Sequence, residues 1–295
     1  TPPNLILAGV VEETFGYEIT FSTWFKFGFP ISLVLLFICW KYLTAIAFKF
    51  EQKSFPGGQK EIRNQLQKLG LITYEEKLVA LIFTMTAIAW VTRDFLLKLI
   101  IPVIDDTIIV MISALIIFLL PNKNRQRRLI NWEEASKLPW GILLLFGGGM
   151  ALASGFKESG LALWIGTQMT LLDGISLFLL VFFLIASVNF LTEITSNLAT
   201  TAMLLPILYP MAMTIDVHPF ILMVSAAVAA SCAFMLPVAT PPNAVVFGSG
   251  YLRIPDMVRV GIWMNILSII LLSVFVYYIL PYLWDFDPLS FVIPK

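Results

Sequence analysis

Four long apolar stretches dominate the hydrophobic pattern of the chain, at residues 22–48, 77–97, 107–121 and 257–284. A bilayer core about 30 Å thick is crossed by a helix of roughly 20 apolar residues. Each stretch therefore predicts a membrane-spanning helix. Residues 49–76, between the first two stretches, are polar and lysine-rich, and we expect a loop there with a short surface helix.

The apolar region 139–250 is interrupted more often than these four stretches. Three consecutive glycines at 147–149 weaken a helix by up to about 1 kcal/mol each relative to alanine, and they indicate either helix packing or a functional break. Residues 175–213 are apolar except for TEITSN at 192–197, and Ser, Thr and Asn favour caps and turns. This pattern predicts a re-entrant hairpin of two half-length helices with its tip, residues 195–197, at membrane depth.

The tetrapeptide TPPN occurs twice, at residues 1–4 and 240–243. The apolar segment 221–237 runs into the second copy, and its two prolines predict one span that is broken there. Lipid cannot satisfy free backbone groups, so such a break survives only inside protein or beside a cavity. Interrupted helices at matching positions of two halves indicate the binding site of a secondary transporter. The two TPPN copies would be those positions, with most of the first half upstream of Thr1.

Composition agrees with this interpretation. Of the 295 residues, 59% are hydrophobic and 13% are charged, whereas soluble domains carry about 25% charged residues. This composition indicates an integral membrane protein, multi-pass, in the lipid bilayer. The 19 basic residues balance the 19 acidic ones, which gives no reason to expect a nucleic-acid partner. The two cysteines lie in apolar runs and predict neither a disulfide nor a metal site.

The distribution of basic residues predicts the orientation. The loop 49–76, the NKNRQRR segment 122–128 and the arginines at 253 and 259 share the cytoplasmic side by the positive-inside rule. The turn 96–106 and the C-terminus then face outside. The sequence contains no Asn-x-Ser/Thr glycosylation site, which favours a prokaryotic inner membrane.

Helix starts at the two breaks suit an anion. Thr240, before two prolines, is an N-cap candidate, and Asn243 adds an amide at the same helix end. Ser196 and Asn197 begin the second half of the hairpin. Each helix N-terminus carries roughly half a positive charge, so two of them can bind carboxylates without Arg or Lys.

Carbonyl groups exposed where the preceding half-helices end suit a cation. The side-chain oxygens of Thr192, Thr195 or Asn197 would complete such a site. Neutral oxygen ligands fit Na⁺ better than a transition metal. The sequence therefore predicts a sodium site beside the anion site.

Other polar residues have competing interpretations. An intramembrane carboxylate is functional by default, so Glu193 binds substrate, caps the hairpin or faces a buried polar neighbour. His218 is expected in a loop, and Arg93 and Asp94 are expected to face water at the end of a span. The small residues at 226–230 indicate helix contacts.

Three motifs occur in the order PWGILLLFGGGMALASGFKESGL, TEITSNLATTAMLLPI and CAFMLPVATPPNAVVFGSG. With them the chain resembles the divalent anion:sodium symporter family of di- and tricarboxylate carriers, over essentially its whole length. The resemblance implies an all-α polytopic membrane protein, an inverted-repeat secondary transporter. It also implies a homodimer with a scaffold domain and a moving transport domain, which is an elevator mechanism of alternating access. The expected function is sodium-coupled transport of di- or tricarboxylates, and a sodium-independent dicarboxylate exchanger remains the alternative.

The resemblance also implies site residues. For Na⁺ these are Thr192, Thr195, Asn197 and the carbonyl of Ala239. For the substrate carboxylate they are Ser196, Asn197, Leu198, Thr240 and Pro241, with Thr1 and Pro2 as the first-repeat counterpart. The family motif has Thr where this chain has Leu198, so one hydroxyl is lost. The first hairpin and the first sodium site would lie upstream of Thr1.

The expected domains follow from the motifs. Residues 1–21 would end a first-repeat broken helix, and 22–138 would form scaffold-type helices and cytoplasmic loops. Residues 139–256 would form the second-repeat transport domain, and 257–295 the last span with an external C-terminus. Two rival functions require features that the sequence does not offer. A channel needs a continuous pore, and an intramembrane hydrolase with Ser196 as nucleophile needs a base, for which His218 is poorly placed. We therefore expect a transporter and not an enzyme.

Overall fold

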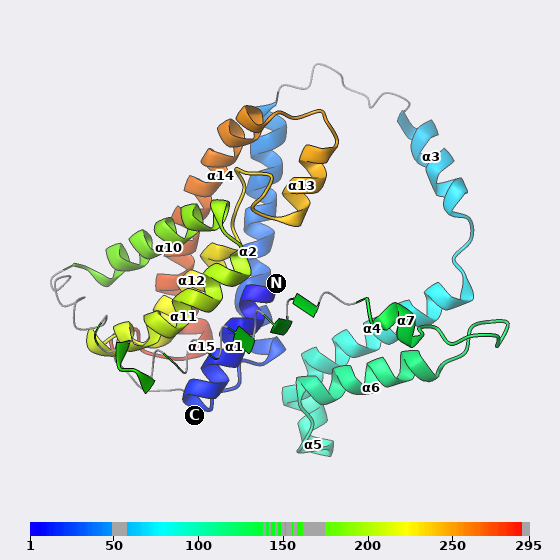
Figure 1. Ribbon diagram of the computed structural model, residues 1–295, viewed down its shortest axis with the longest axis horizontal. Coiled ribbons are helices and arrows are strands. Elements are labelled where there is room, and N and C mark those ends of the chain that lie inside the picture. Colours follow the sequence, from blue (N-terminus) through cyan, green and yellow to red (C-terminus); the bar gives the residue numbers. More distant parts are fainter. Residues whose placement is uncertain are drawn as a thin grey trace. The chain divides into compact units, whose positions relative to one another are not determined.

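The computed structural model describes residues 1–48, 58–137 and 175–290, and scattered positions between 140 and 164 (Figure 1). The glycine-rich segment predicted at 147–149 lies partly outside the described residues. Within the described residues the regular elements are helices, and one isolated β-bridge pairs Pro121 with Arg128. The chain divides into two compact units. The first comprises Thr1–Ile19, Lys26–Leu43 and Trp140–Lys295, and the second comprises Thr20–Phe25 and Thr44–Pro139.

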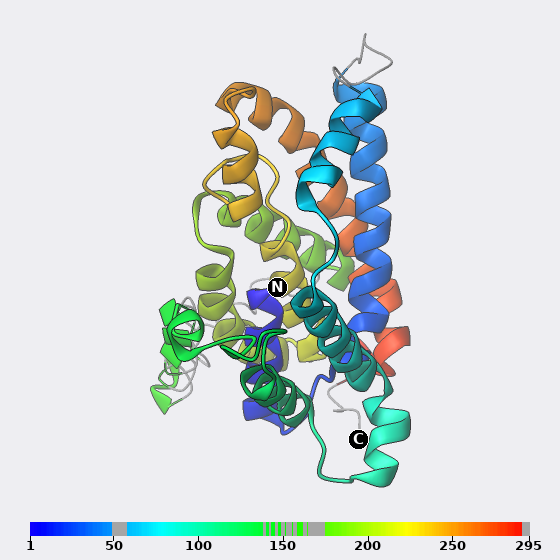
Figure 2. The ribbon, with the colours of Figure 1, turned by 90° about the vertical axis from the view of Figure 1, so that its right-hand side faces the viewer.

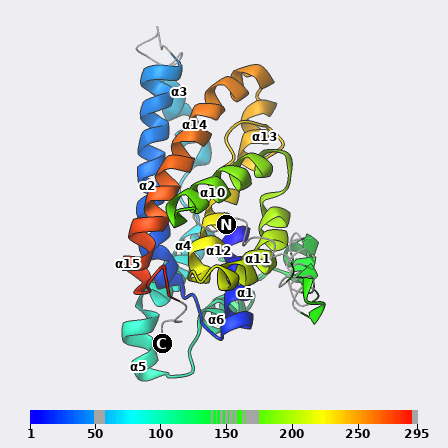
Figure 3. The ribbon, with the colours of Figure 1, turned by 90° about the vertical axis from the view of Figure 1, so that its left-hand side faces the viewer.

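The first unit is a set of apolar helices packed around α12. Its helices are α1 (Pro2–Phe15), the greater part of α2 (Phe21–Lys41), α10 (Leu177–Ile194), α11 (Asn197–Thr214), α12 (Pro219–Ala230), α13 (Pro241–Gly248), α14 (Ile254–Val274), the π-helical η4 (Phe275–Ile279) and α15 (Leu280–Trp284). Helix α12 packs against α1, α10, α11 and α14 (Figure 3). It is apolar on every side, which is typical of a buried helix. Its alanines at 226, 227, 229 and 230 are fully buried, as the sequence predicted for helix contacts.

The second unit is built on the antiparallel pair of α4 and α6 (Figure 1, Figure 2). Its elements are the π-helical η1 (Tyr42–Ala47), α3 (Gly58–Leu69), α4 (Tyr74–Thr92), the π-helical η2 (Arg93–Leu97), α5 (Lys98–Ile100), α6 (Asp106–Leu119) and α7 (Trp132–Ala135). Thr86 and Ser113 hydrogen-bond between the two helices at 2.7 Å. The indole Nε1 of Trp90 donates to the carbonyl of Asp106 at 3.1 Å, which fixes the end of α4 beside the start of α6.

Three of the four predicted spans, 22–48, 77–97 and 257–284, correspond to long apolar helices. Four helices are long and apolar enough to cross a membrane: Phe21–Ala47, Tyr74–Ile100, Leu177–Ile194 and Ile254–Trp284. The third predicted span, 107–121, corresponds to the shorter α6. Both arms of the hairpin, α10 and α11, have 18 residues, so the expectation of half-length arms is wrong. The break between them, at Thr195 and Ser196, is where the sequence placed it.

Arg93 does not face water as the sequence suggested. Its side chain is 1% exposed, and Nη1 lies 2.9 Å from Oδ1 of Asp106. The change from α-helical to π-helical geometry at Arg93 coincides with this placement against the start of α6. His218 does precede a helix, as expected of a loop residue, but it is buried and caps α12. Its Nδ1 accepts the N–H of Phe220 at 3.3 Å.

Candidate functional site at the broken helix

The break in the second TPPN segment is longer than the sequence predicted. Helix α12 ends at Ala230, and α13 begins only at Pro241. The prolines therefore start the second half-helix but do not end the first. The reason lies in the backbone N–H groups of Phe234, Met235 and Leu236, which donate to the carboxylate of Glu193 at 2.7, 3.0 and 2.9 Å. Hydrogen bonds to a charged acceptor are strong, and here they replace those that a continued helix would have made.

Glu193 is a buried group near the end of α10, and its partners explain why it is tolerated. Besides the three backbone N–H groups, Nδ2 of Asn265 in α14 donates to Oε1 of Glu193 at 2.7 Å. Oδ1 of Asn265 accepts the N–H of Phe234 at 3.2 Å. A buried charge costs little only when it is paired or fully hydrogen-bonded. These contacts support the interpretation that Glu193 faces a buried polar neighbour, here Asn265, and they also hold the loop.

Three more residues of α10 and α14 border this loop, and the sequence analysis had not singled them out. Nδ2 of Asn189 donates to the carbonyl of Cys232 at 2.6 Å and to Oγ of Ser268 at 3.3 Å. A Cβ atom on Gly261 would lie 2.2 Å from the carbonyl oxygen of Phe234, so only glycine permits this approach of α14 to the loop.

The spacing of these residues along the sequence could have indicated that they surround the break. Asn189 and Glu193 lie four positions apart, and Gly261, Asn265 and Ser268 follow at intervals of four and three. Such intervals place side chains on one helix face. Polar residues that share a face inside an apolar helix are a functional-site hypothesis by default. The same pattern would have identified α10 and α14 as the walls of the break.

The hairpin tip brings two predicted cation ligands together. Oγ1 of Thr192 lies 2.6 Å from Oδ1 of Asn197 and 3.0 Å from the carbonyl oxygen of Ala230. One hydroxyl proton is shared between two acceptors, so these three oxygens are electron-rich as a group. Among the described residues, no three His, Cys, Asp or Glu side chains form a metal-binding group. The oxygens near the tip belong to a hydroxyl, a side-chain amide and a backbone carbonyl, which are neutral ligands of the kind that suits an alkali cation.

The other two predicted sodium ligands, Thr195 and Ala239, contact different groups from those that surround Thr192. Oγ1 of Thr195 donates to the carbonyl of Leu191 at 2.8 Å and lies 2.6 Å from Oγ1 of Thr200. Ala239 is buried, and its N–H donates to the carbonyl of Leu236 at 3.2 Å. The carbonyl that contacts Thr192 is that of Ala230, at the end of α12, which the sequence did not indicate.

Ser196 leaves the start of α11 open. It is the N-cap residue, it is exposed, and among the described residues its side chain makes no capping hydrogen bond. The first N–H groups of a helix have no partner within the helix. Leu198, in the same turn, is buried. The start of α11 thus offers a hydroxyl and backbone donors to an anion.

The start of α13 is more completely satisfied. Oγ1 of Thr240 accepts the N–H of Asn243 at 3.4 Å. The side-chain amide of Asn243 donates to the carbonyls of Ala233 and Leu236 at 3.1 and 3.0 Å. Its amide hydrogens therefore close the loop, whereas the sequence had suggested that they serve a bound group. Pro241 is exposed at the first position of the helix.

The first TPPN copy meets the end of α12. Oγ1 of Thr1 lies 3.1 Å from Oγ of Ser231, the residue that follows α12. Helix α1, which begins at Pro2, packs against α11 and α12. The N-terminus of α1 and the break that precedes the second TPPN copy are therefore adjacent, although their residues are 230 positions apart.

Comparison with known proteins places these helices in a family. A family model described as the sodium:sulfate symporter transmembrane region matches residues 1–284. The chain belongs to this family. It is 50% identical over 286 residues to the sodium-dependent dicarboxylate transporter SdcS of Staphylococcus saprophyticus, which covers 95% of this chain and 55% of that protein. It is 49% identical over 292 residues to the protein of the same name from Staphylococcus aureus strain USA300, covering 97% of the chain and 56% of the relative.

Family membership confirms the resemblance that was inferred from the three motifs. The chain is a helical, polytopic membrane protein of the sodium:sulfate symporter family. It spans about half the length of the curated relatives it matches. The predicted domain boundaries and the ligand sets stay predictions.

Proposed function

We propose that the protein moves dicarboxylates across a membrane by alternating access, driven by sodium. The observation that carries the proposal is the hairpin tip. The open N-terminus of α11 at Ser196 directly follows the oxygen group of Thr192, Asn197 and Ala230. An anion site and a cation site that share Asn197 provide a physical basis for coupling, because each ligand improves the electrostatic environment of the other.

The proposed sodium site uses Thr192, Thr195, Asn197 and the carbonyl of Ala239, with the carbonyl of Ala230 as an addition. Three oxygens already lie close together there and share one proton. Sodium would supply the positive charge that this arrangement lacks. The names of the relatives, which describe sodium-dependent transporters, support this ion.

The proposed substrate site uses helix starts instead of basic side chains. Its residues are Ser196, Asn197, Leu198, Thr240 and Pro241, with Thr1 and Pro2 from the other TPPN copy. The partial positive charge of a helix N-terminus favours a carboxylate. Both α11 and α1 start near the end of α12, because Thr192 contacts both Asn197 and the carbonyl of Ala230, and Thr1 lies beside Ser231. Relatives named for dicarboxylates favour that class of substrate over tricarboxylates.

The larger assembly is also part of the proposal. We infer a homodimer in a bacterial inner membrane, with scaffold helices and a moving transport domain, and with the domain boundaries expected from the sequence. The bacterial origin of the relatives supports the location. Their names, which denote transporters, favour this function over an intramembrane hydrolase with Ser196 as nucleophile.

The deciding experiment is uptake of a radiolabelled four-carbon dicarboxylate into vesicles that contain the complete protein. We expect saturable uptake that requires an inward sodium gradient. The variant Asn197→Ala should abolish it while the protein still elutes as a single species in detergent, and Asn124→Ala, in an exposed loop, is the matched control. Uptake that needs internal dicarboxylate but no sodium would show an exchanger instead, and a current that does not saturate would show a channel.

A further inference from the structure

Helix α3 in the second unit carries an exposed apolar stripe. Ile62, Leu66 and Leu69 follow at intervals of four and three and are 64%, 65% and 81% exposed. Lys60 and Lys68 lie on the opposite side of the helix by the same periodicity. A short helix with one apolar face and basic residues on the other is typical of helices that lie in the plane of a membrane interface.

The apolar stripe continues toward a membrane span. Leu71 and Ile72, in the connection between α3 and α4, are also exposed. Helix α4 starts immediately afterwards with a capping box, in which Oγ1 of Thr73 accepts the N–H of Glu76 at 3.2 Å and the Glu76 carboxylate accepts the N–H of Thr73 at 2.7 Å. Because α4 is long and apolar enough to span a membrane, this connection keeps α3 close to the end of a span.

A basic hairpin lies at the same end of α4. The segment 121–128 is folded by a β-bridge between Pro121 and Arg128, and Oδ1 of Asn122 accepts the N–H groups of two residues of the turn. The N–H of Lys123 donates to the carboxylate of Glu75 at 3.0 Å. This hydrogen bond ties the hairpin to the first turn of α4, where α3 also ends.

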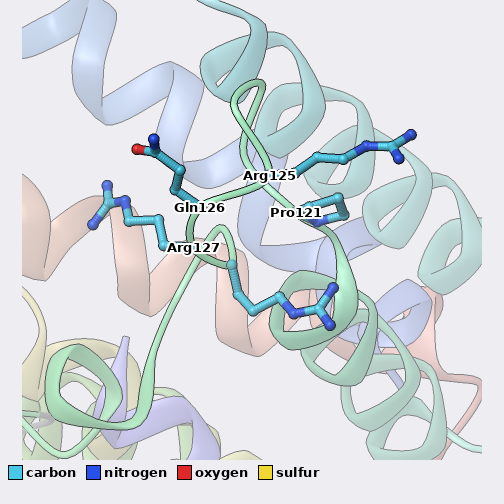
Figure 4. Close-up of a pocket in the computed structure, with 5 residues that line it drawn as sticks. Pro121, Arg125, Gln126 and Arg127 are labelled. Carbon is cyan, nitrogen blue, oxygen red and sulfur yellow. The ribbon is translucent and has the colours of Figure 1, made fainter.

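The arginines of the hairpin suit an extended surface more than a single small anion. The hairpin surrounds an open pocket of about 450 Å³, and Figure 4 shows the side chains of Arg125 and Arg127 pointing in opposite directions. Arg127 is paired with Glu134 at 3.1 Å. Arg125 is exposed and forms no ion pair with any residue that the structure describes. Arg125 is therefore the member of this diverging pair that can meet a phosphate group.

We propose that α3 and the hairpin 121–128 form a lipid-binding surface at the cytoplasmic interface of the membrane. The stripe of Ile62, Leu66 and Leu69 enters the acyl-chain boundary. Lys60, Arg63 and Lys68 of α3, with Arg125 of the hairpin, bind phosphates of anionic lipids. The positive-inside rule assigns this end of the spans to the cytoplasmic leaflet, whose negative surface potential is complementary to these residues.

Spin labels placed along α3 test the apolar part of the proposal. In the complete protein all native cysteines, Cys39 and Cys232 among them, are replaced by alanine. Single cysteines at Ile62, Leu66 or Leu69 are then labelled with a nitroxide, and Asn64→Cys serves as the control on the polar face. The protein is reconstituted in vesicles that contain phosphatidylglycerol. We expect oxygen, which partitions into lipid, to reach the three stripe positions better than a water-soluble nickel chelate, and the reverse at position 64.

Either of two results would overturn the proposal. Preferential access of the nickel chelate at all four positions would place α3 in water. Exclusion of both reagents from the stripe would place it against protein. Elution of each labelled protein as a single species in detergent is the control for folding, and it does not depend on transport.

A second measurement tests the charges. The label at Leu66→Cys should lie deeper in phosphatidylglycerol vesicles than in phosphatidylcholine vesicles. Replacement of Lys60, Arg63, Lys68 and Arg125 by glutamine should remove this difference, whereas Lys98→Gln, at the other end of α4, should preserve it. If the label lies at the same depth in both kinds of vesicle while the four basic residues are intact, anionic lipid does not bind them as proposed.

Discussion

The side-chain amide of Asn265 donates to the carboxylate of Glu193 at 2.7 Å, across 72 positions of the sequence. Both side chains are buried, and both accept the N–H of Phe234. The pair therefore joins α10, α14 and the loop after α12 in a single hydrogen-bonded group. This group holds the loop between α12 and α13 in place, and the prolines of TPPN start α13.

Asn265→Leu should destabilise the protein and impair uptake together. The substitution removes a donor from a buried carboxylate, and a hydrogen bond to a charged group contributes about 1.5–3 kcal/mol. We expect a lower temperature of unfolding in detergent and a lower rate of sodium-driven uptake. Ser273→Ala is the matched control, because among the described residues Oγ of Ser273 bonds to the Ile269 carbonyl of its own helix alone. Equal unfolding temperatures for the Asn265 variant and the unmodified protein would contradict the proposed role of the pair.

Gly261→Ala should displace the loop. The added Cβ would lie 2.2 Å from the carbonyl oxygen of Phe234, and the neighbouring atoms are backbone, which cannot rotate away. Overpacking of this kind costs about 1–3 kcal/mol. We expect a lower unfolding temperature and slower uptake, measured as above. Gly248→Ala is the control, since a Cβ there meets no described atom within 4 Å. If both variants behave alike, the close approach of α14 is not a constraint.

The apolar pattern was sufficient to predict three of the long apolar helices and the break between α10 and α11, because these depend on local composition. It did not predict that Leu177–Ile194 is itself long enough to cross a membrane. The early end of α12 could not be predicted in that way. It depends on Glu193, which lies 41 positions before the nearest N–H that it accepts, and on Asn265 in a later helix. Arg93 shows the same limit: its sequence neighbours suggested water, but Asp106 from α6 provides a buried partner. Contacts between residues that are far apart in the sequence cannot be recognised from a local pattern of apolar and polar residues.

Thr192 provides a test of the sodium site. Thr192→Val keeps the shape of the side chain but removes the oxygen that lies beside Asn197 and Ala230. We expect a higher sodium concentration for half-maximal uptake, by about tenfold or more if one ligand contributes about 1.4 kcal/mol. Thr192→Ser, which keeps the oxygen, should stay close to the unmodified protein. A sodium dependence that is the same in both variants would exclude Thr192 as a ligand.

Leu198 stands where the family resemblance implies a threonine, and its burial is compatible with two roles. If the side chain borders the substrate, Leu198→Thr adds a hydroxyl next to the carboxylates. A neutral hydrogen bond contributes about 0.5–1.5 kcal/mol, so KM should fall by up to about tenfold. The change should differ between a four-carbon dicarboxylate and a tricarboxylate, because the extra carboxylate alters which groups lie near this position. Leu198→Val is the control, since valine matches the shape of threonine without the hydroxyl.

If Leu198 instead packs within the protein, the hydroxyl is buried without a partner. Such burial costs about 1–3 kcal/mol in proteins, so the threonine variant should unfold at a lower temperature than the valine variant. The KM values for the two substrates would then change by the same factor. Leu198 is 8% exposed, which makes this outcome physically reasonable. The ratio of the two KM values therefore decides between the roles: a changed ratio assigns Leu198 to the substrate site, and a constant ratio with lower stability assigns it to the packing of α11.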